Sequence, residues 1–314
     1  MLSNNSFRSG QSCAVSPSLV HKRDASAVLV TAVDTGEDGW TIRARLPAHH
    51  TFHNDATGRQ AGYHDPLHIL EAFRQGCIAI GHLTYAVPPE AHFLVRRYEL
   101  SVLDWRALHY RPEPAALDLR TEVRRQFRAR GDGPVHGVEL AATAMRNGAA
   151  AVEMSVSFGW LPDGSWQRMR SGSRWEAGPQ PVAADPPTVG RERPENVVIG
   201  PPRHRFGDGS VCAPVVVDTG NPTFFDHPLD HLPAALILEA SRQLARAALG
   251  PRSSAVLGPS WLRCEFLSFA ELSPACAVTL APASGTSAFR ATVSQTGQQR
   301  AVVELGFAAP EPPQ

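Results

Sequence analysis

The same three polar residue types recur at helical spacing in two stretches of the chain. "LEAFRQ" carries a Glu, an Arg and a Gln at positions i, i+3 and i+4, and "LEASRQ" carries them again. They are Glu71, Arg74 and Gln75 in the first copy and Glu239, Arg242 and Gln243 in the second. Residues at this spacing share one helical face. A carboxylate can accept a proton and a guanidinium can bind an anion, so each patch is a candidate site for acid–base chemistry or ligand binding.

The neighbours of each patch are apolar. Leu70 and Phe73 flank the first copy, and Leu238 and Leu244 flank the second. An exposed intrahelical ion pair would contribute only about 0.2–0.5 kcal/mol, whereas burial of an unpaired charge costs several kcal/mol. Keeping these groups twice on an apolar cylinder therefore indicates either a buried structural network or a ligand site.

A histidine-bearing loop precedes each patch. "AHHTFHND" contains His49, His50, His53 and Asp55, and "TFFDHPLDH" contains Asp226, His227, Asp230 and His231. The spacing from His227 to His231 is that of a helical metal pair, but it falls in a loop with Pro228, so no metal site is predicted. Free N–H groups at a helix start can hold a carbonyl oxygen during acyl chemistry. The loop histidines are candidates for acid–base or substrate-binding roles, with solvated loop residues as the alternative.

The elements that must position these residues follow the same order in both halves. The first half predicts strands at 27–33 and 40–46, a helix at 66–87, a strand at 92–105 and a hairpin about Asn147-Gly148. The second half predicts a strand at 211–218, a helix at 233–249, a strand at 259–269 and a hairpin about Thr296-Gly297. Each helix is apolar around most of its circumference, which favours a helix wrapped by a curved antiparallel sheet, an α+β fold.

Three internal matches indicate a duplication. Thr51 of "TFHND" corresponds to Thr223 of "TFFDH", Leu70 to Leu238, and the hairpin glycine Gly148 to Gly297. The expected organisation is a flexible tail at 1–18, a first repeat at 19–175, a Pro- and Gly-rich linker at 176–196 and a second repeat at 197–310. The two repeats are expected to pair their sheets about a pseudo-twofold axis, as homodimers do.

Composition excludes several classes of protein. Hydrophobic residues make up 43% of the 314 residues and the formal net charge is +0, so neither disorder nor a nucleic-acid partner is expected. The five cysteines show no CxxC spacing, and the sequence shows neither a secretory signal nor a long apolar run, so a cytoplasmic protein is expected. Lys22 is the only lysine, which disfavours Schiff-base chemistry. The motifs of P-loop NTPases, nicotinamide dehydrogenases, serine hydrolases and zincins are absent from the sequence.

At "FFDHPLDHLPAALILEASRQ" the sequence resembles the hotdog superfamily, in which a histidine-bearing loop leads into a central helix that carries a Glu. It is most similar to the A-factor biosynthesis (AfsA-type) family, with two hotdog repeats, a "DPLxxxExxRQ" helix in the first and a "DHPxDHxPxxxxxEAxRQ" helix in the second. "HDPLHILEAFRQ" and "DHPLDHLPAALILEASRQ" match both patterns, and the resemblance spans about residues 20–308. The chain departs from the hydroxyacyl dehydratase pattern in the shorter distance from His227 to Glu239 and in having Ala234 where Gly is common.

The resemblance implies an acyltransferase. It would move a β-ketoacyl group from an acyl carrier protein or coenzyme A thioester to the hydroxyl of dihydroxyacetone phosphate, toward γ-butyrolactone, butenolide or furan signals that control antibiotic production. No cofactor or metal is expected. The implied catalytic residues are Glu239, Arg242, Glu71 and Arg74, with the carboxylates as proton acceptors and the arginines as phosphate ligands. The implied substrate-binding residues are His53, His227, His231, Gln75 and Gln243.

Hotdog sites form where two hotdogs pair, so each loop is expected to face the helix of the other repeat. This places His53 near Glu239 and Arg242, or His227 near Glu71 and Arg74. Two other functions stay open from the sequence: a hotdog thioesterase or dehydratase, and a non-catalytic acyl-binding module whose Glu/Arg pairs stabilise the core. Acyl chain length, the thioester carrier, the number of active sites, and a monomer or homodimer also stay open.

Overall fold

The computed structural model describes residues 10–129, 132–173, 178–204, 209–282 and 287–308. The chain forms two compact units. The first comprises Met1–His49, Leu67–Tyr98 and Val102–Ser171, and the second comprises His50–Pro66, Glu99–Ser101 and Gly172–Gln314. The loop that precedes the first long helix thus belongs to the second unit, although it lies in the first half of the sequence.

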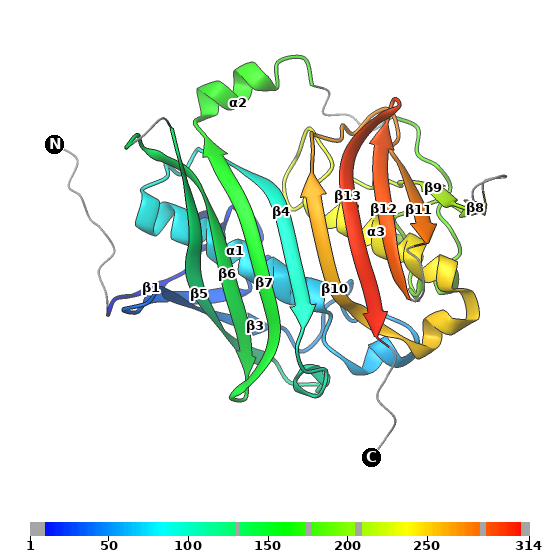
Figure 1. The fold of residues 1–314 in the computed structure, drawn as a ribbon, viewed down its shortest axis with the longest axis horizontal. Coiled ribbons are helices and arrows are strands. Elements are labelled where there is room, and N and C mark those ends of the chain that lie inside the picture. The colour runs from blue at the N-terminus through cyan, green and yellow to red at the C-terminus, as the bar shows by residue number, and fades with distance from the viewer. Residues whose placement is uncertain (1–9, 130–131, 174–177, 205–208, 283–286, 309–314) are drawn as a thin grey trace. The chain divides into compact units, whose positions relative to one another are not determined.

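The first unit is an antiparallel sheet with one long helix (Figure 1). The helix α1 is Pro66–Tyr85, and the strands follow the order β1-β2-β3-β5-β6-β7-β4. The strands are β1 Ser12–Ala14, β2 Val30–Thr35, β3 Trp40–Leu46, β4 His92–Val102, β5 Ala115–Arg128, β6 Val135–Arg146 and β7 Ala149–Leu161. A short helix, α2 Asp163–Met169, follows β7.

Glycines bring α1 close to its sheet. A Cβ atom added to Gly76 would lie 2.4 Å from Ile42 Cδ1 on β3, and one added to Gly81 would lie 2.7 Å from the Phe93 ring on β4. Ile42, Phe73 and Ile80 are fully buried in this layer. The apolar surface of α1 therefore packs against the sheet. Charged side chains such as Arg74 fit only where they extend beyond this packed surface.

The second unit repeats this plan of one helix and one antiparallel sheet (Figure 1). Its helix is α3 Ala234–Leu249, and its strands follow the order β10-β13-β12-β11-β9-β8. The strands are β8 Arg203–His204, β9 Val211–Pro214, β10 Leu257–Phe266, β11 Ala277–Pro282, β12 Ala288–Gln295 and β13 Gln298–Ala308. Contacts from α3 reach β9, β11, β12 and β13, so this helix lies across the sheet.

Both predicted hairpins are present. Asn147 and Gly148 have φ of 50° and 82° between β6 and β7, and Thr296 and Gly297 have φ of 50° and 79° between β12 and β13. Two successive residues in the left-handed region form the turn that matches strand twist, and glycine accepts that geometry without a Cβ clash. The prediction of an α+β hotdog fold, repeated twice, is confirmed by the helix and sheet of each unit.

The predicted tail and linker need correction. Residues 12–14 form β1 on the edge of the first sheet, paired with β2 from Ser12 opposite Asp34, because backbone pairing overrides a polar composition. Residues 1–9 lie outside the described residues. The linker segment contains 3-10 helices at Pro186–Val189 and Pro194–Asn196, and its Val189 and Arg191 are buried. Proline at the start of a helical turn is compatible with such helices, so the segment is structured around the site.

Two further features concern the cysteines and the helices. All five cysteines are free. Among the described residues, no helix has both the length and the apolarity needed to cross a membrane.

Candidate functional site

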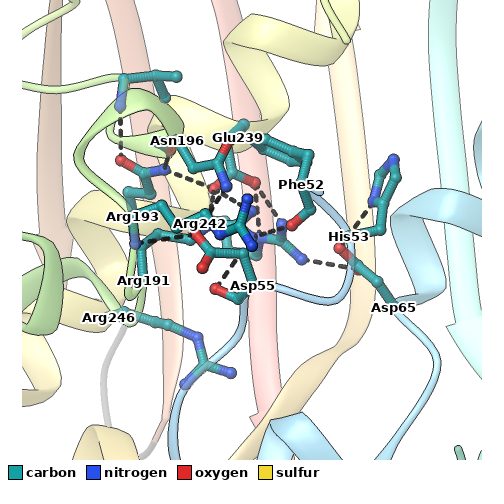
Figure 2. A network of polar contacts seen from close by, with 12 residues as sticks. Phe52, His53, Asp55, Asp65, Arg191, Arg193, Asn196, Glu239, Arg242 and Arg246 are labelled. Carbon is teal, nitrogen blue, oxygen red and sulfur yellow. Dashed lines mark hydrogen bonds and ion pairs between the residues drawn. The ribbon is translucent and has the colours of Figure 1, made fainter. Parts of the chain in front are cut away.

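Glu239 lies at the centre of a buried charge network in the second unit (Figure 2). Only 1% of this residue is exposed. Its Oε1 accepts hydrogen bonds from Arg191 Nη2 at 2.7 Å and from Gln243 Nε2 at 2.7 Å, and its Oε2 accepts one from Arg242 Nε at 2.8 Å. Arg242 Nη2 forms an ion pair with the same Oε2, without hydrogen-bond alignment. Two guanidinium groups and one amide thus occupy both oxygens of this carboxylate.

The helix α3 is held in register by Gln243. The Gln243 Oε1 accepts a hydrogen bond from the Val198 backbone N–H at 2.9 Å, and its Nε2 donates to the Asn196 carbonyl at 2.8 Å. Both backbone groups belong to the segment that begins with the 3-10 helix Pro194–Asn196. A buried amide that satisfies two backbone groups fixes the position of Glu239, one turn before it, and of the adjacent Arg242.

His53 and Asp65 extend the network. Arg242 Nη1 donates to Asp65 Oδ1 at 2.7 Å, and Asp65 Oδ2 lies 3.1 Å from His53 Nδ1. His53 and Asp65 are 9% and 4% exposed. Figure 2 shows the imidazole on the side of Asp65 that faces away from Arg242. The structure therefore brings His53 to Arg242 through a carboxylate that the sequence did not single out.

Electrostatics keep both carboxylates of the network ionised. Burial raises the pKa of Asp65, but the Arg242 charge and the His53 hydrogen bond outweigh it and hold that pKa well below its usual range. Burial likewise opposes ionisation of Glu239, and Arg191 and Arg242 outweigh it, so its pKa is lowered. An ionised Asp65 can only accept a hydrogen bond, so His53 Nδ1 must be the donor. With that tautomer, the lone pair of the imidazole lies on Nε2.

Arg191 ties the histidine loop to the helix. Besides its bonds to Glu239, its Nη1 donates to the Phe52 carbonyl at 2.6 Å, and its guanidinium carbon lies 4.1 Å from the centroid of the Phe52 ring. Asn196 Nδ2 donates to Asp55 Oδ2 at 2.7 Å and to the Thr51 carbonyl at 2.8 Å. Two side chains from the former linker thus hold the backbone on either side of His53.

The first unit contains a second, simpler cluster around Glu71. Arg74 donates from Nε to Glu71 Oε2 at 2.7 Å and from Nη2 to Oε1 at 2.8 Å. Lys22 Nζ lies 3.2 Å from Oε1, and Gln75 Nε2 donates to it at 3.0 Å. The Glu71 and Arg74 side chains are 21% and 28% exposed. Burial raises the pKa of Glu71, but the Arg74 and Lys22 charges outweigh it and hold that pKa well below its usual range.

The other two predicted substrate-binding histidines, His227 and His231, contact acidic residues of their own loop. His231 Nδ1 contacts Asp230 Oδ1 at 2.7 Å, and His227 Nδ1 lies 3.5 Å from Asp226 Oδ2. His50 lies beside His53, with ring centroids 4.8 Å apart. His227 belongs to the second unit and Glu71 and Arg74 to the first, and their predicted proximity stays a prediction.

Sequence reasoning missed Lys22, Arg191, Asn196 and the role of Asp65. The available signal was a further internal match, from "HKRDASAVL" at His21 to "GRERPENVV" at Gly190, at an offset of 169 residues, 191 minus 22. In both copies a 3-10 helix ends in a left-handed residue, His21 with φ 55° and Gly190 with φ 75°. The charged residue that pairs with the helix Glu comes next. The Pro-rich composition of the second copy concealed this match.

The geometry suits the Glu239–Arg242 pair and the His53–Asp65 pair to different chemistry. Both oxygens of Glu239 are occupied by Arg191 and Arg242, and Arg242 is also paired with Asp65, which suits positioning rather than proton transfer. An imidazole oriented by a carboxylate is suited to accept and return a proton, as in hydrolase triads. The network can therefore serve a reaction in which a hydroxyl group loses its proton.

Comparison with known proteins identifies the family of the chain. The A-factor biosynthesis hotdog domain model matches residues 3–161 and 175–305. A 2-oxo-3-(phosphooxy)propyl 3-oxoalkanoate synthase of Streptomyces coelicolor is 31% identical over 286 residues, covering 90% of this chain and 86% of the synthase. A synthase of the same name from Streptomyces griseus is also 31% identical, covering 90% of both chains. An inactive point mutant of the CurK dehydratase superposes with a TM-score of 0.50 at 10% identity, covering 88% of this chain and 95% of that one, and it shows the fold alone. The chain belongs to the A-factor biosynthesis hotdog domain family.

Proposed function

We propose that the protein is an acyltransferase that joins a β-ketoacyl group from a thioester to the hydroxyl of dihydroxyacetone phosphate. The observation that carries this proposal is the buried His53–Asp65 pair, held by Arg242, in a member of this family. The name of the two Streptomyces relatives describes an ester between a 3-oxoalkanoate and a 2-oxo-3-(phosphooxy)propyl group, which is the ester that this transfer would form.

The reaction follows from the groups present. His53 Nε2 takes the proton of the acceptor hydroxyl, and the hydroxyl oxygen attacks the thioester carbonyl. A carbon–oxygen bond forms, the carbon–sulfur bond breaks, and His53 returns the proton to the departing thiolate. No electrons are exchanged with an external carrier, so the transfer requires no redox cofactor.

Asp65 and the residues behind it act on His53. Asp65 holds the Nδ1 proton and stabilises the imidazolium that forms during transfer, and Arg242 fixes Asp65. Glu239 in turn neutralises Arg191 and Arg242. In this proposal Glu239 and Arg242 are positioning residues, and His53 is the catalytic residue.

In this proposal each chain has one complete catalytic centre, the His53–Asp65 pair. The match of "TFHND" with "TFFDH" aligns His53 with Phe225, and the helix match aligns Asp65 with Pro233. Neither Phe nor Pro can donate, accept or carry a proton through its side chain. The second repeat therefore has neither group of the pair at the matching positions of its sequence.

The donor would be an acyl carrier protein or coenzyme A thioester, the chain a monomer or homodimer, and a reducing cytoplasm its location. A direct test incubates the purified chain with a β-ketoacyl thioester, with and without dihydroxyacetone phosphate, and identifies the product by mass spectrometry. Thiol release that requires the acceptor, with the phosphorylated ester as product, supports the proposal. Thiol release at the same rate without the acceptor would establish a thioesterase instead, and no turnover would favour an acyl-binding module.

A further inference from the structure

We infer that Arg191 is the positioning residue that places His53 for proton transfer, by joining the loop before α1 to helix α3. This inference rests on the proposed function. Arg191 is 3% exposed, and its guanidinium makes three kinds of contact at once. It pairs with Glu239 Oε1, donates to the Phe52 carbonyl at 2.6 Å, and stacks on the Phe52 ring.

The contact with Phe52 acts directly on the residue that follows it. The Phe52 carbonyl belongs to the peptide unit that also carries the His53 N–H, so a bond to that oxygen restrains the backbone at His53. The stacked ring restrains the Phe52 side chain as well. The imidazole is then held by a backbone restraint at one end and by Asp65 at the other.

Lys22 provides the comparison within the same chain. It occupies the position that matches Arg191 at the offset of 169 residues, and its ammonium group pairs with Glu71 Oε1. A compact ammonium satisfies the helix carboxylate there. The fork of an arginine can bind a carboxylate and a carbonyl in fixed directions together, whereas a lysine acts as a point charge. The guanidinium is thus required only where a loop must be held as well.

The variant Arg191→Lys separates these two tasks. It keeps a positive charge for Glu239, as Lys22 does for Glu71, but removes the flat group that stacks on Phe52 and reaches its carbonyl. We expect kcat to fall about 100-fold, the cost of a small misplacement of a catalytic group, with little change in KM for either substrate. The matched control Lys22→Arg should leave kcat, KM and the melting temperature close to those of the wild type.

Chemical rescue distinguishes positioning from a merely structural role. In Arg191→Ala, added methylguanidinium should raise kcat, whereas added methylammonium of the same charge should not. If Arg191→Lys does not fold, as judged by circular dichroism, Phe52→Leu serves instead, because it removes the stacked ring and leaves Arg191 in place. We then expect a smaller loss of kcat with an unchanged KM.

The outcomes separate this inference from the proposed function. A wild-type chain that forms no ester with dihydroxyacetone phosphate contradicts the proposed function itself. A wild-type chain that forms the ester, with Arg191→Lys or Phe52→Leu turning over at the wild-type rate, contradicts only the role of Arg191. A rise in KM with unchanged kcat would also overturn it, because it would place Arg191 in binding rather than in positioning.

Discussion

The Glu–Arg–Gln face occurs in both repeats, yet the two copies differ in burial and in charge. Around Glu71, one carboxylate meets Arg74 and Lys22, and about a fifth to a quarter of the Glu and Arg side chains is exposed. Around Glu239, two carboxylates meet two guanidinium groups, and all four residues are buried. The helices contribute the same side chains in both places. The loops that reach them contribute different ones, and these loops decide what each cluster can do.

This difference shows how a duplicated motif divides its roles. The Gln of each copy performs the same task, since Gln75 binds Leu29 N–H and Ala27 carbonyl as Gln243 binds Val198 N–H and Asn196 carbonyl. The Glu–Arg pair is therefore first a structural device of the repeat. In the second unit, Asp65 and His53 connect to that device, and in the proposed function this makes His53 the proton-transfer group.

The largest expected effect is a difference in kcat between variants of the His53 loop and of the His227 loop. His53→Asn should lower kcat by about 10²–10⁴-fold, the usual contribution of a positioned acid–base group, because it removes the imidazole that accepts and returns the proton in the proposed reaction. His227→Asn, in the matching loop, should stay near the wild-type rate. Initial rates at saturating thioester and acceptor measure both, and thermal melts show that each variant is folded. Equal losses in the two variants would contradict a single centre.

The next effect compares the two carboxylates in stability. Glu239→Gln leaves Arg191 and Arg242 buried beside a neutral amide, so unfolding should become easier by about 3–5 kcal/mol. Glu71→Gln leaves Arg74 and Lys22 partly exposed, and the loss should be about 1 kcal/mol. Urea unfolding of both variants gives the comparison. Similar losses would show that the burial difference does not control their energetics.

A smaller effect should be shared by both repeats. Gln75→Leu and Gln243→Leu each leave a buried backbone N–H and carbonyl without their side-chain partner, at a cost of about 1–3 kcal/mol. We expect the two losses to agree, because the hydrogen bonds correspond one to one. Gln298→Leu, at an exposed position of β13, is the control and should change stability by less than about 0.5 kcal/mol. Strongly unequal losses would show that Gln75 and Gln243 do not stabilise their helices in the same way.

The sequence predicts the regular parts of this molecule well, because periodicity is local. The Asn147-Gly148 and Thr296-Gly297 turns and both long helices depend on residues a few positions apart, and the structure has them within a few residues of the expected ends. The contacts of Asp65 and Arg191 with α3 depend instead on how distant segments fold together. Arg191 is a single charge in a segment rich in proline and glycine, and nothing in its immediate neighbours shows that it is buried. Only the weak match with the Lys22 segment indicated it.

The smallest expected effect is a difference in pH dependence between the two helix carboxylates. Both Glu71 and Glu239 have a folded-state pKa below the unfolded value of about 4, so each contributes stability that is present above that pH and is lost as pH falls through the folded pKa. Burial opposes ionisation of both carboxylates. The Asp65 carboxylate also raises the pKa of Glu239. The side chains that shift the pKa of Glu71 most, Arg74, Lys22 and Gln75, all lower it. As pH falls below about 4, the stability gap between wild type and Glu239→Gln should therefore close before the gap between wild type and Glu71→Gln. Urea midpoints from pH 7 to pH 3 measure both gaps. If the Glu71 gap closes first, the network charge of Asp65 does not reach Glu239, and the coupling between loop and helix in the second unit is weaker than its geometry indicates.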